Sequence, residues 1–154
     1  MPRSCDRPAV AHLIESDGPG GAERIVAALA TALQQSGTRN VVFLPAAGEG
    51  WLARQLEGSG VLVETYRLET PLSPACAQSI ADAFARHRID LAHGHEFTMA
   101  VYGAWAAWYA GIPCVVTMHG SRYYAGRLQR RLALRAACSG RTRNLAVMKI
   151  TIGA

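Results

Sequence analysis

Short apolar runs alternate with amphipathic stretches along the chain. Apolar runs bounded by turn residues indicate buried strands, and apolar positions that recur every three or four residues indicate helices. The predicted strands are Val10–Glu15, Asn40–Leu44, Val61–Leu68, Asp90–His95 and Pro113–Met118, with Asn144–Thr151 as a sixth strand or an edge segment. The predicted helices are Gly21–Gln35, Glu49–Glu57, Pro74–Arg88, Phe97–Ala110 and Arg122–Cys138.

Two of these elements show a regular spacing of their residues. The first helix has an apolar stripe at helical spacing, made of Ile25, Ala28, Leu29, Ala32 and Leu33. The third strand alternates, with Val61, Val63 and Thr65 on one side. The stripe of the helix indicates the side that packs against the core.

Strands separated by helices imply βαβ units and a parallel sheet. We therefore predict an α/β fold with a single Rossmann-like, doubly wound parallel sheet of strand order 3-2-1-4-5-6. The 154 residues suffice for one domain. We place this domain at residues 9–143, with a flexible arm at 1–8 and a terminal strand or tail at 144–154.

Composition narrows the class of protein without naming a function. Half of the residues are hydrophobic and 18% are charged, which excludes a disordered chain. The net charge of +5 favours phosphate-bearing ligands, nucleic acid or an anionic membrane, and does not choose among them. The four cysteines show no CxxC spacing, so we expect no zinc site built from cysteine.

One uncharged segment, Phe97–Met118, is about long enough to span a bilayer. Gly111 and Pro113 interrupt it, and proline inside a helix removes a hydrogen bond and clashes with the preceding turn. We therefore predict a buried helix of about 14 residues, a tight turn and a buried strand.

A glycine-rich loop, Asp17–Gly21, precedes the first helix. Gly20 and Gly21 would let a ligand approach the backbone N–H groups at the helix N-terminus, which favours phosphate, although an ordinary strand-to-helix turn has the same composition. Glu23 stands where a GxGxxG motif requires its third glycine, and the second strand has no acidic residue at its end. Both points argue against a nicotinamide dinucleotide.

Histidines follow the fourth and fifth strands. His93 and His95 share one face of a strand, and with Glu96 they could contact a sugar or phosphate, bind a metal or pack structurally. With no third ligand evident, we predict no metal. His119 ends the fifth strand and would point into the same crevice.

The last predicted helix is basic and amphipathic. It carries Arg127, Arg130, Arg131 and Arg135. This face is either a solvated surface or a contact with an anionic membrane.

Taken together, these motifs resemble the N-terminal domain of the family 4, GT-B glycosyltransferases, from about Val10 to Arg143. The resemblance rests on His12-Leu13-Ile14, Gly20-Gly21-Ala22-Glu23-Arg24, Leu29-Ala30, Leu33, Gly60-Val61, Arg88-Ile89-Asp90-Leu91-Ala92-His93-Gly94-His95 and Gly111-Ile112-Pro113-Cys114-Val115-Val116-Thr117-Met118-His119-Gly120. It implies one half of a two-domain enzyme whose other half binds most of a nucleotide-sugar. That donor-binding domain, with its Glu-x7-Glu signature, is absent from this sequence.

The resemblance also implies roles for particular residues. Gly20 and Gly21 would lie against the donor diphosphate, His119 beside the reacting sugar as the catalytic residue, and His93, His95 and Glu96 on the acceptor side. Such enzymes use a nucleotide-sugar as substrate, usually retain stereochemistry and need neither a metal nor a cofactor. The acceptor would be a glycan or a lipid-linked molecule.

The same resemblance sets expectations for partners and location. The chain would be inactive without a donor-domain partner, would not bind nucleic acid, and would be cytoplasmic, docked through the basic helix on the inner membrane face. The alternative is a non-catalytic module that binds a glycan or a partner, or a truncated fragment.

Overall fold

The structure is a computed structural model that describes residues 7–119 and, for the backbone only, residues 145–150. The helices are α1 (Gly21–Gln35), α2 (Trp51–Leu56), α3 (Pro74–Arg86) and α4 (Glu96–Ala110). The strands are β1 (Val10–Leu13), β2 (Asn40–Pro45), β3 (Leu62–Tyr66), β4 (Leu91–His95), β5 (Cys114–His119) and β6 (Leu145–Ile150). The predicted helix Arg122–Cys138 lies outside the described residues.

All six strands are parallel, in the order β3-β2-β1-β4-β5-β6. The predicted Rossmann-like, doubly wound sheet and its strand order are confirmed. The sequence order reverses between β1 and β4, which pair directly, with His12 opposite His93. A doubly wound sheet forms its ligand crevice at the carboxyl ends of such a pair of strands.

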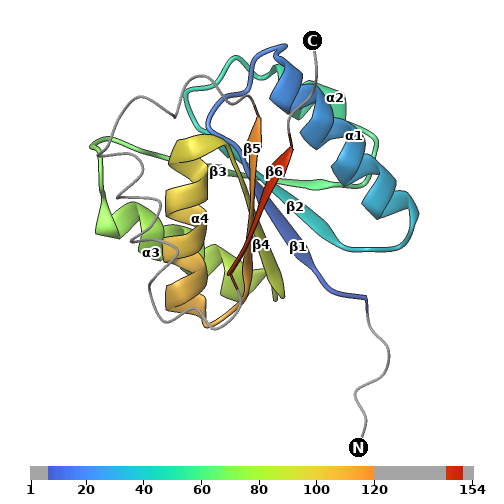
Figure 1. Ribbon diagram of the computed structural model, residues 1–154. Helices are drawn as coiled ribbons and strands as arrows, with labels where there is room; N and C mark the ends of the chain where they lie inside the picture. Colours follow the sequence, from blue (N-terminus) through green and yellow to red (C-terminus); the bar gives the residue numbers. More distant parts are fainter. Residues whose placement is uncertain (1–6, 120–144, 151–154) are drawn as a thin grey trace, which may run out of the picture.

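Helices cover both faces of the sheet, α1 and α2 on one and α3 and α4 on the other (Figure 1). The larger core lies under α3 and α4, where the Phe43 and Phe84 rings meet edge to face at 5.5 Å. The smaller core lies under α1 and α2 and includes Val26, Val42 and Leu52. Because β2 is buried from both sides, its residues 41–44 read as a continuous apolar run.

The buried face of α1 differs from the predicted one. Val26 and Ala30 are fully buried, whereas Ala28 and Ala32 are exposed and Ile25 is only half-buried. The two candidate stripes are neighbours on the helix surface, about 100° apart, so spacing alone does not separate them. The small side chains of the buried stripe let α1 approach the sheet closely.

Of the alternating residues in and before β3, only the first is buried. Val61 is buried, but Val63 is 39% exposed and Thr65 is exposed. The reason is that β3 lies at the edge of the sheet, where no further strand and little of the helical layers cover it. An alternating sequence can therefore occur in a strand that remains partly exposed to water.

Helix α4 ends as predicted. Its C-cap, Gly111, has φ 69°, a left-handed conformation that suits glycine, and Pro113 follows before β5 begins at Cys114. The helix is buried along most of its length but leaves Trp108 51% exposed. Within residues 7–119 and 145–150, no helix is long and apolar enough to cross a membrane.

Candidate active site

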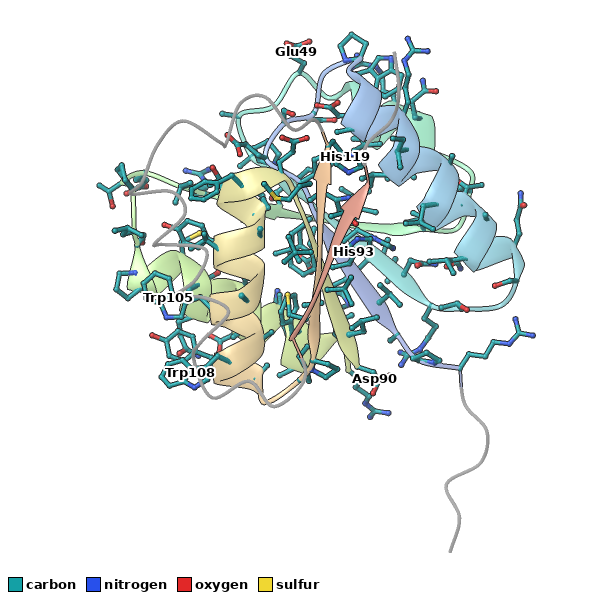
Figure 2. All side chains as sticks on the ribbon, viewed as in Figure 1. Glu49, Asp90, His93, Trp105, Trp108 and His119 are labelled. Carbon is teal, nitrogen blue, oxygen red and sulfur yellow. The ribbon has the colours of Figure 1, made fainter. Side chains whose placement is uncertain are left out.

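The candidate site lies at the carboxyl ends of β1, β4 and β5, where the predicted residues converge. Figure 2 shows His119 and Glu49 near the edge at which the strands end, while Asp90 marks the opposite edge. The Asp17–Gly21 loop follows β1, His95 and Glu96 join β4 to α4, and His119 is the last residue of β5.

Asp17 anchors the glycine-rich loop. Its carboxylate, 5% exposed, accepts hydrogen bonds from the backbone N–H groups of Gly50 at 2.8 Å, Leu52 at 2.6 Å and Ala53 at 3.3 Å. The Asp17 side chain thus caps the N-terminus of α2, where unpaired donors and the helix dipole both favour a negative charge. The loop shape is therefore held by α2 as well as by its own glycines.

Replacing Asp17 should destabilise the protein. We expect Asp17→Ala to lower the free energy of unfolding by about 3 kcal/mol, because buried backbone donors lose a charged acceptor. Asp82→Ala is the matched control, since Asp82 is an exposed carboxylate whose partner is the Gln78 amide at 2.9 Å. Its cost should stay below about 0.5 kcal/mol in urea unfolding. An equal loss of unfolding free energy in the two variants would show that Asp17 does not stabilise the loop and α2.

Gly20 is the N-cap of α1, and Gly21 and Glu23 lie in the first turn of the helix. Glu23 is 6% exposed, and its carboxylate accepts a hydrogen bond from the Ser16 hydroxyl. That carboxylate lies against Gly20, so closely that a Cβ at this position would collide with it. A Cβ at Gly21, in contrast, would meet no described atom within 4 Å. The N-terminus of α1 is therefore accessible at Gly21, whereas the Glu23 side chain fills the space next to Gly20.

Four histidines form a cluster on the face of the sheet that carries α1. His12 comes from β1, His93 and His95 from β4, and His119 from β5. Nδ1 of His95 lies 3.0 Å from Nε2 of His119, and Nε2 of His95 lies 3.4 Å from Nδ1 of His12. The His95 and His119 rings are stacked, with centroids 5.3 Å apart. The predicted residues His93, His95 and His119 are thus brought together, and His12 joins them.

Burial controls the charge of this cluster. Desolvation, helped by the neighbouring His93, lowers the pKa of His12 to about 3, and desolvation together with His119 lowers that of His93 to about 4. The pKa values of His95 and His119 are lowered as well, mainly by burial. Since the ordinary value is about 6.5, these rings are neutral at neutral pH.

The charges of Glu96 and Glu23 act in the opposite direction on the pKa of His119. Two carboxylates from different elements therefore lie near this ring. Glu96 is half-buried and opens α4 with φ 64°, a left-handed conformation that is uncommon for a residue with a side chain. Such backbone strain occurs at functional sites more often than elsewhere.

His12, His93 and His95 can each offer one ring nitrogen to a metal, and these nitrogens lie within 4.8 Å of one another. A tetrahedral zinc site with Zn–N distances of about 2.0–2.1 Å would place its ligand atoms about 3.3 Å apart. The 4.8 Å limit allows wider spacings than that, and the nitrogens of the cluster already pair with each other and with Asn40 and Thr117. We therefore describe it as a hydrogen-bonded cluster, and the absence of a metal stays a prediction.

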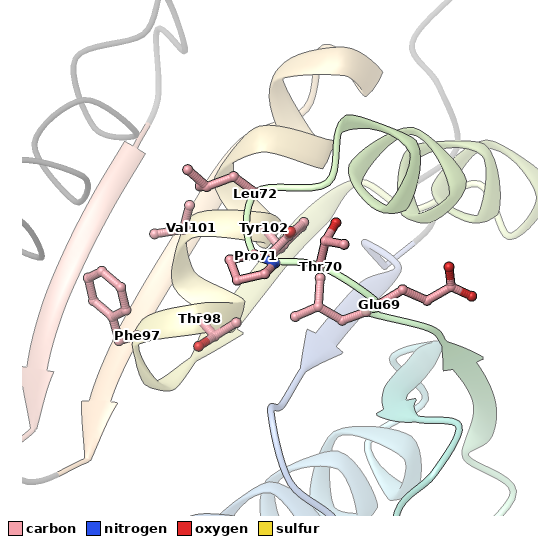
Figure 3. A pocket seen from close by; sticks show the side chains of 9 residues that line it. Glu69, Thr70, Pro71, Leu72, Phe97, Thr98, Val101 and Tyr102 are labelled. Atoms are coloured by element: carbon pink, nitrogen blue, oxygen red, sulfur yellow. The ribbon is translucent and has the colours of Figure 1, made fainter.

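Two adjoining hollows open at the same edge of the sheet. One, of about 620 Å³, has a mixed lining in which Glu15, Arg67 and Thr98 are among the polar residues. The other, of about 420 Å³, lies between the chain segment 68–72 and the first turns of α4, and it is mainly apolar (Figure 3). Leu68, Glu69 and Thr98 line both hollows, so the two adjoin, and together they are called the groove.

Sequence reasoning missed His12, Glu23 and Thr117 as members of the site. His12 is a polar residue in the middle of a central strand, and in the predicted strand order β1 lies beside β4, so the signal was present. The sequence indicates Glu23 as a break in a nucleotide-binding motif and as part of the family motif, without a role in the site. Thr117, whose hydroxyl lies 2.8 Å from Nε2 of His93, left no comparable signal. The predicted membrane contacts Arg127, Arg130, Arg131 and Arg135 lie outside the described residues.

Comparison with known sequences locates the chain in one family. The model of the family described as Glycosyltransferase Family 4 matches residues 19–151. No curated protein matches the chain.

Comparison with solved structures supports the fold. Acinetobacter baumannii MurG is 17% identical, with a TM-score of 0.65 over 96% of this chain and 43% of its own. Anabaena HepE, solved in complex with UDP, is 21% identical, with a TM-score of 0.63 over 92% of this chain and 43% of its own. A putative UDP-N-acetylglucosamine 2-epimerase from Listeria monocytogenes is 15% identical, with a TM-score of 0.62 over 94% and 39%. This chain therefore spans less than half of each.

Proposed function

Because this chain belongs to glycosyltransferase family 4, we propose that it forms the acceptor-side half of an enzyme that transfers a sugar from a nucleotide-sugar. The observation that carries the proposal is the meeting of His119, the Gly20–Gly21 turn and Glu96 at the carboxyl ends of β1, β4 and β5. Binding of a sugar diphosphate needs backbone N–H donors for the phosphates and a polar side chain for the sugar, and both kinds of group meet at this edge.

Gly21 is the proposed contact for the donor diphosphate. The open space at this residue leaves the N-terminus of α1 accessible to an anion, and the Glu23 carboxylate limits the approach at Gly20. The HepE structures contain UDP in one case and UDP-glucose in the other, which supports a nucleotide-sugar as the donor. The remaining donor contacts would come from a separate donor-binding domain.

The acceptor is proposed to enter along the groove at the same edge. The Glu15 and Arg67 side chains in the larger hollow suit the hydroxyl groups of a glycan, and the apolar smaller hollow, with Leu72 and Val101, suits a hydrophobic portion. Glu96, which precedes the lining residues Phe97 and Thr98 at the start of α4, and His93 of the histidine cluster are the other proposed acceptor contacts. His95 is 1% exposed, so we assign it a positioning role beneath His119.

Membrane docking through Arg127, Arg130, Arg131 and Arg135, on the cytoplasmic side, is a further part of this proposal. It rests on the basic pattern of the sequence and on the lipid-linked acceptors of the family.

The proposal predicts that activity needs a second domain and depends on His119. Combined with a family 4 donor-binding domain, the chain should release nucleoside diphosphate and transfer sugar, and His119→Ala should lower the turnover about 100-fold. The measurement is product formation from radiolabelled nucleotide-sugars. His87→Ala is the control, since His87 caps α3 at the opposite edge and pairs with Glu64 at 2.6 Å.

Two results would contradict this function. Robust turnover by the chain without any donor domain would show that the site is complete in itself. Glycan binding that persists without turnover in every donor-domain mixture would favour a non-catalytic binding module.

A further inference from the structure

A buried asparagine lies at the inner end of the histidine cluster, and its orientation is defined. Asn40, 2% exposed, donates from Nδ2 to the backbone oxygens of Thr38 at 2.8 Å and Ala30 at 3.3 Å. An amide nitrogen can only donate and an amide oxygen can only accept. The side chain of Asn40 therefore turns its oxygen, Oδ1, toward His12.

This orientation determines where His12 carries its proton. Nε2 of His12 lies 3.4 Å from Oδ1 of Asn40, so Nε2 must be the N–H donor. In a neutral imidazole the other nitrogen is then an acceptor. Nδ1 of His12 consequently presents a lone pair to Nε2 of His95, 3.4 Å away.

The same reasoning extends to the edge of the sheet. Nε2 of His95 donates to His12, which leaves Nδ1 of His95 as the acceptor for Nε2–H of His119 at 3.0 Å. Nδ1 of His119 then carries a lone pair and no proton. This atom is buried and has no hydrogen-bond partner among the described residues. If all three histidines carried the proton on Nδ1 instead, the N–H of His119 would be buried without an acceptor. The lone pair on Nε2 of His12 would also face the Oδ1 lone pairs of Asn40, and each of these two defects costs about 1–3 kcal/mol.

We propose that Asn40, His12 and His95 are positioning residues that hold His119 as the Nε2–H tautomer, so that its Nδ1 accepts a hydrogen bond from a substrate hydroxyl group. The inference rests on the proposed function for the identity of the substrate. A hydroxyl group can donate to this lone pair, whereas a fully ionised phosphate oxygen cannot. His119 thus selects the sugar part of the donor or the acceptor hydroxyl, and the diphosphate is left to Gly21.

Nitrogen NMR on the full chain labelled with ¹⁵N-histidine tests the tautomers directly. Signals are assigned by replacing each of the five histidines in turn by glutamine. We expect His12, His95 and His119 each to carry the proton on Nε2. We also expect a through-hydrogen-bond coupling between Nδ1 of His95 and Nε2 of His119. Protonation of Nδ1 in His119, or no coupling between the two rings, would overturn the proposal.

Variants test whether Asn40 is the origin of this order. Asn40→Leu should remove the preference of His12 for the Nε2–H tautomer and weaken the coupling between His95 and His119. Thr117→Val, which affects only the hydrogen bond to His93, should leave the tautomer and the coupling unchanged. If Asn40→Leu fails to fold, His12→Phe removes the same link while keeping an aromatic ring. An unchanged coupling in the folded variant would overturn the role of Asn40. Failure of sugar transfer leaves these spectra unaffected, so the two proposals can fail separately.

Discussion

The free energy of unfolding should fall by about 6 kcal/mol between pH 7 and pH 5, because His12, His93 and His95 are held neutral in the folded state. Burial lowers the pKa of His12 to about 3 and that of His93 to about 4, and it also lowers the pKa of His95. In the unfolded chain each ring returns to a pKa of about 6.5. At pH 5 each buried histidine then costs about 2 kcal/mol.

The sign follows from proton uptake. As the pH falls below about 6.5 the unfolded chain binds protons that the folded cluster does not bind until the pH is near 4 or lower. Stability is therefore fully present above pH 6.5 and is lost as the pH decreases through that window. A loss of this size is comparable to the whole stability of a typical domain, so we expect acid unfolding near pH 5.

Urea unfolding at a series of pH values measures this effect. Replacing one member of the cluster, as in His93→Gln, should reduce the slope of free energy against pH between 6.5 and 5 by about a third. A free energy of unfolding that stays flat across that window in the unmodified protein would show that the cluster is hydrated or already charged when folded.

Gly94→Ala should lower the free energy of unfolding by about 3 kcal/mol or more. We expect this to be the largest loss caused by adding one methyl group to any glycine among the described residues. Gly94 lies in β4 directly beneath α4. A Cβ there would lie 2.6 Å from the backbone oxygen of Met99 and 2.8 Å from Cα of Ala100. Because both contacts are backbone atoms, no side-chain rotation can relieve them, and α4 would have to move away from the sheet.

Gly21→Ala is the matched control for this glycine. A Cβ at Gly21 meets no described atom within 4 Å, and alanine is favoured over glycine in a helix, so stability should stay the same or rise by about 0.5 kcal/mol. The comparison is made by thermal and urea unfolding of both variants. Equal stability of Gly94→Ala and the unmodified protein would mean that β4 and α4 are not packed as closely as described.

The two glycines also separate structure from function. If the diphosphate approaches Gly21, the Gly21→Ala variant should be stable but bind a nucleotide-sugar more weakly in the reconstituted enzyme. Gly94, in contrast, serves the packing of β4 against α4 and touches no proposed ligand position.

The fold could be predicted from the hydrophobic pattern because each element carries a strong local signal. Gly21–Gln35 was predicted with the bounds that the structure has, and Gly111 with Pro113 marks the boundary between α4 and β5. The strand order follows from right-handed crossovers, which leave few ways to build a sheet from alternating strands and helices. The side of α1 that is buried could not be predicted, because it depends on how closely the helix approaches the sheet.

The candidate site was predicted only in outline. His93, His95 and His119 follow strand ends, so the sequence indicates that they share an edge of the sheet. The buried position of His95, the presence of His12 and the contact of Glu23 with Gly20 depend on distances between residues that are far apart in the chain. No pattern within a single element contains that information.

By itself, the sequence determined the Rossmann-like sheet, its strand order, the edge at which a ligand site is expected and the family resemblance, since these depend on local periodicity and on motifs. Only the tertiary structure decided which histidines are buried, which ring nitrogen accepts and which glycine stays open. Those properties arise when β1, β4 and β5 are placed side by side, because desolvation and hydrogen-bond pairing are created by neighbours in space and not by neighbours in sequence.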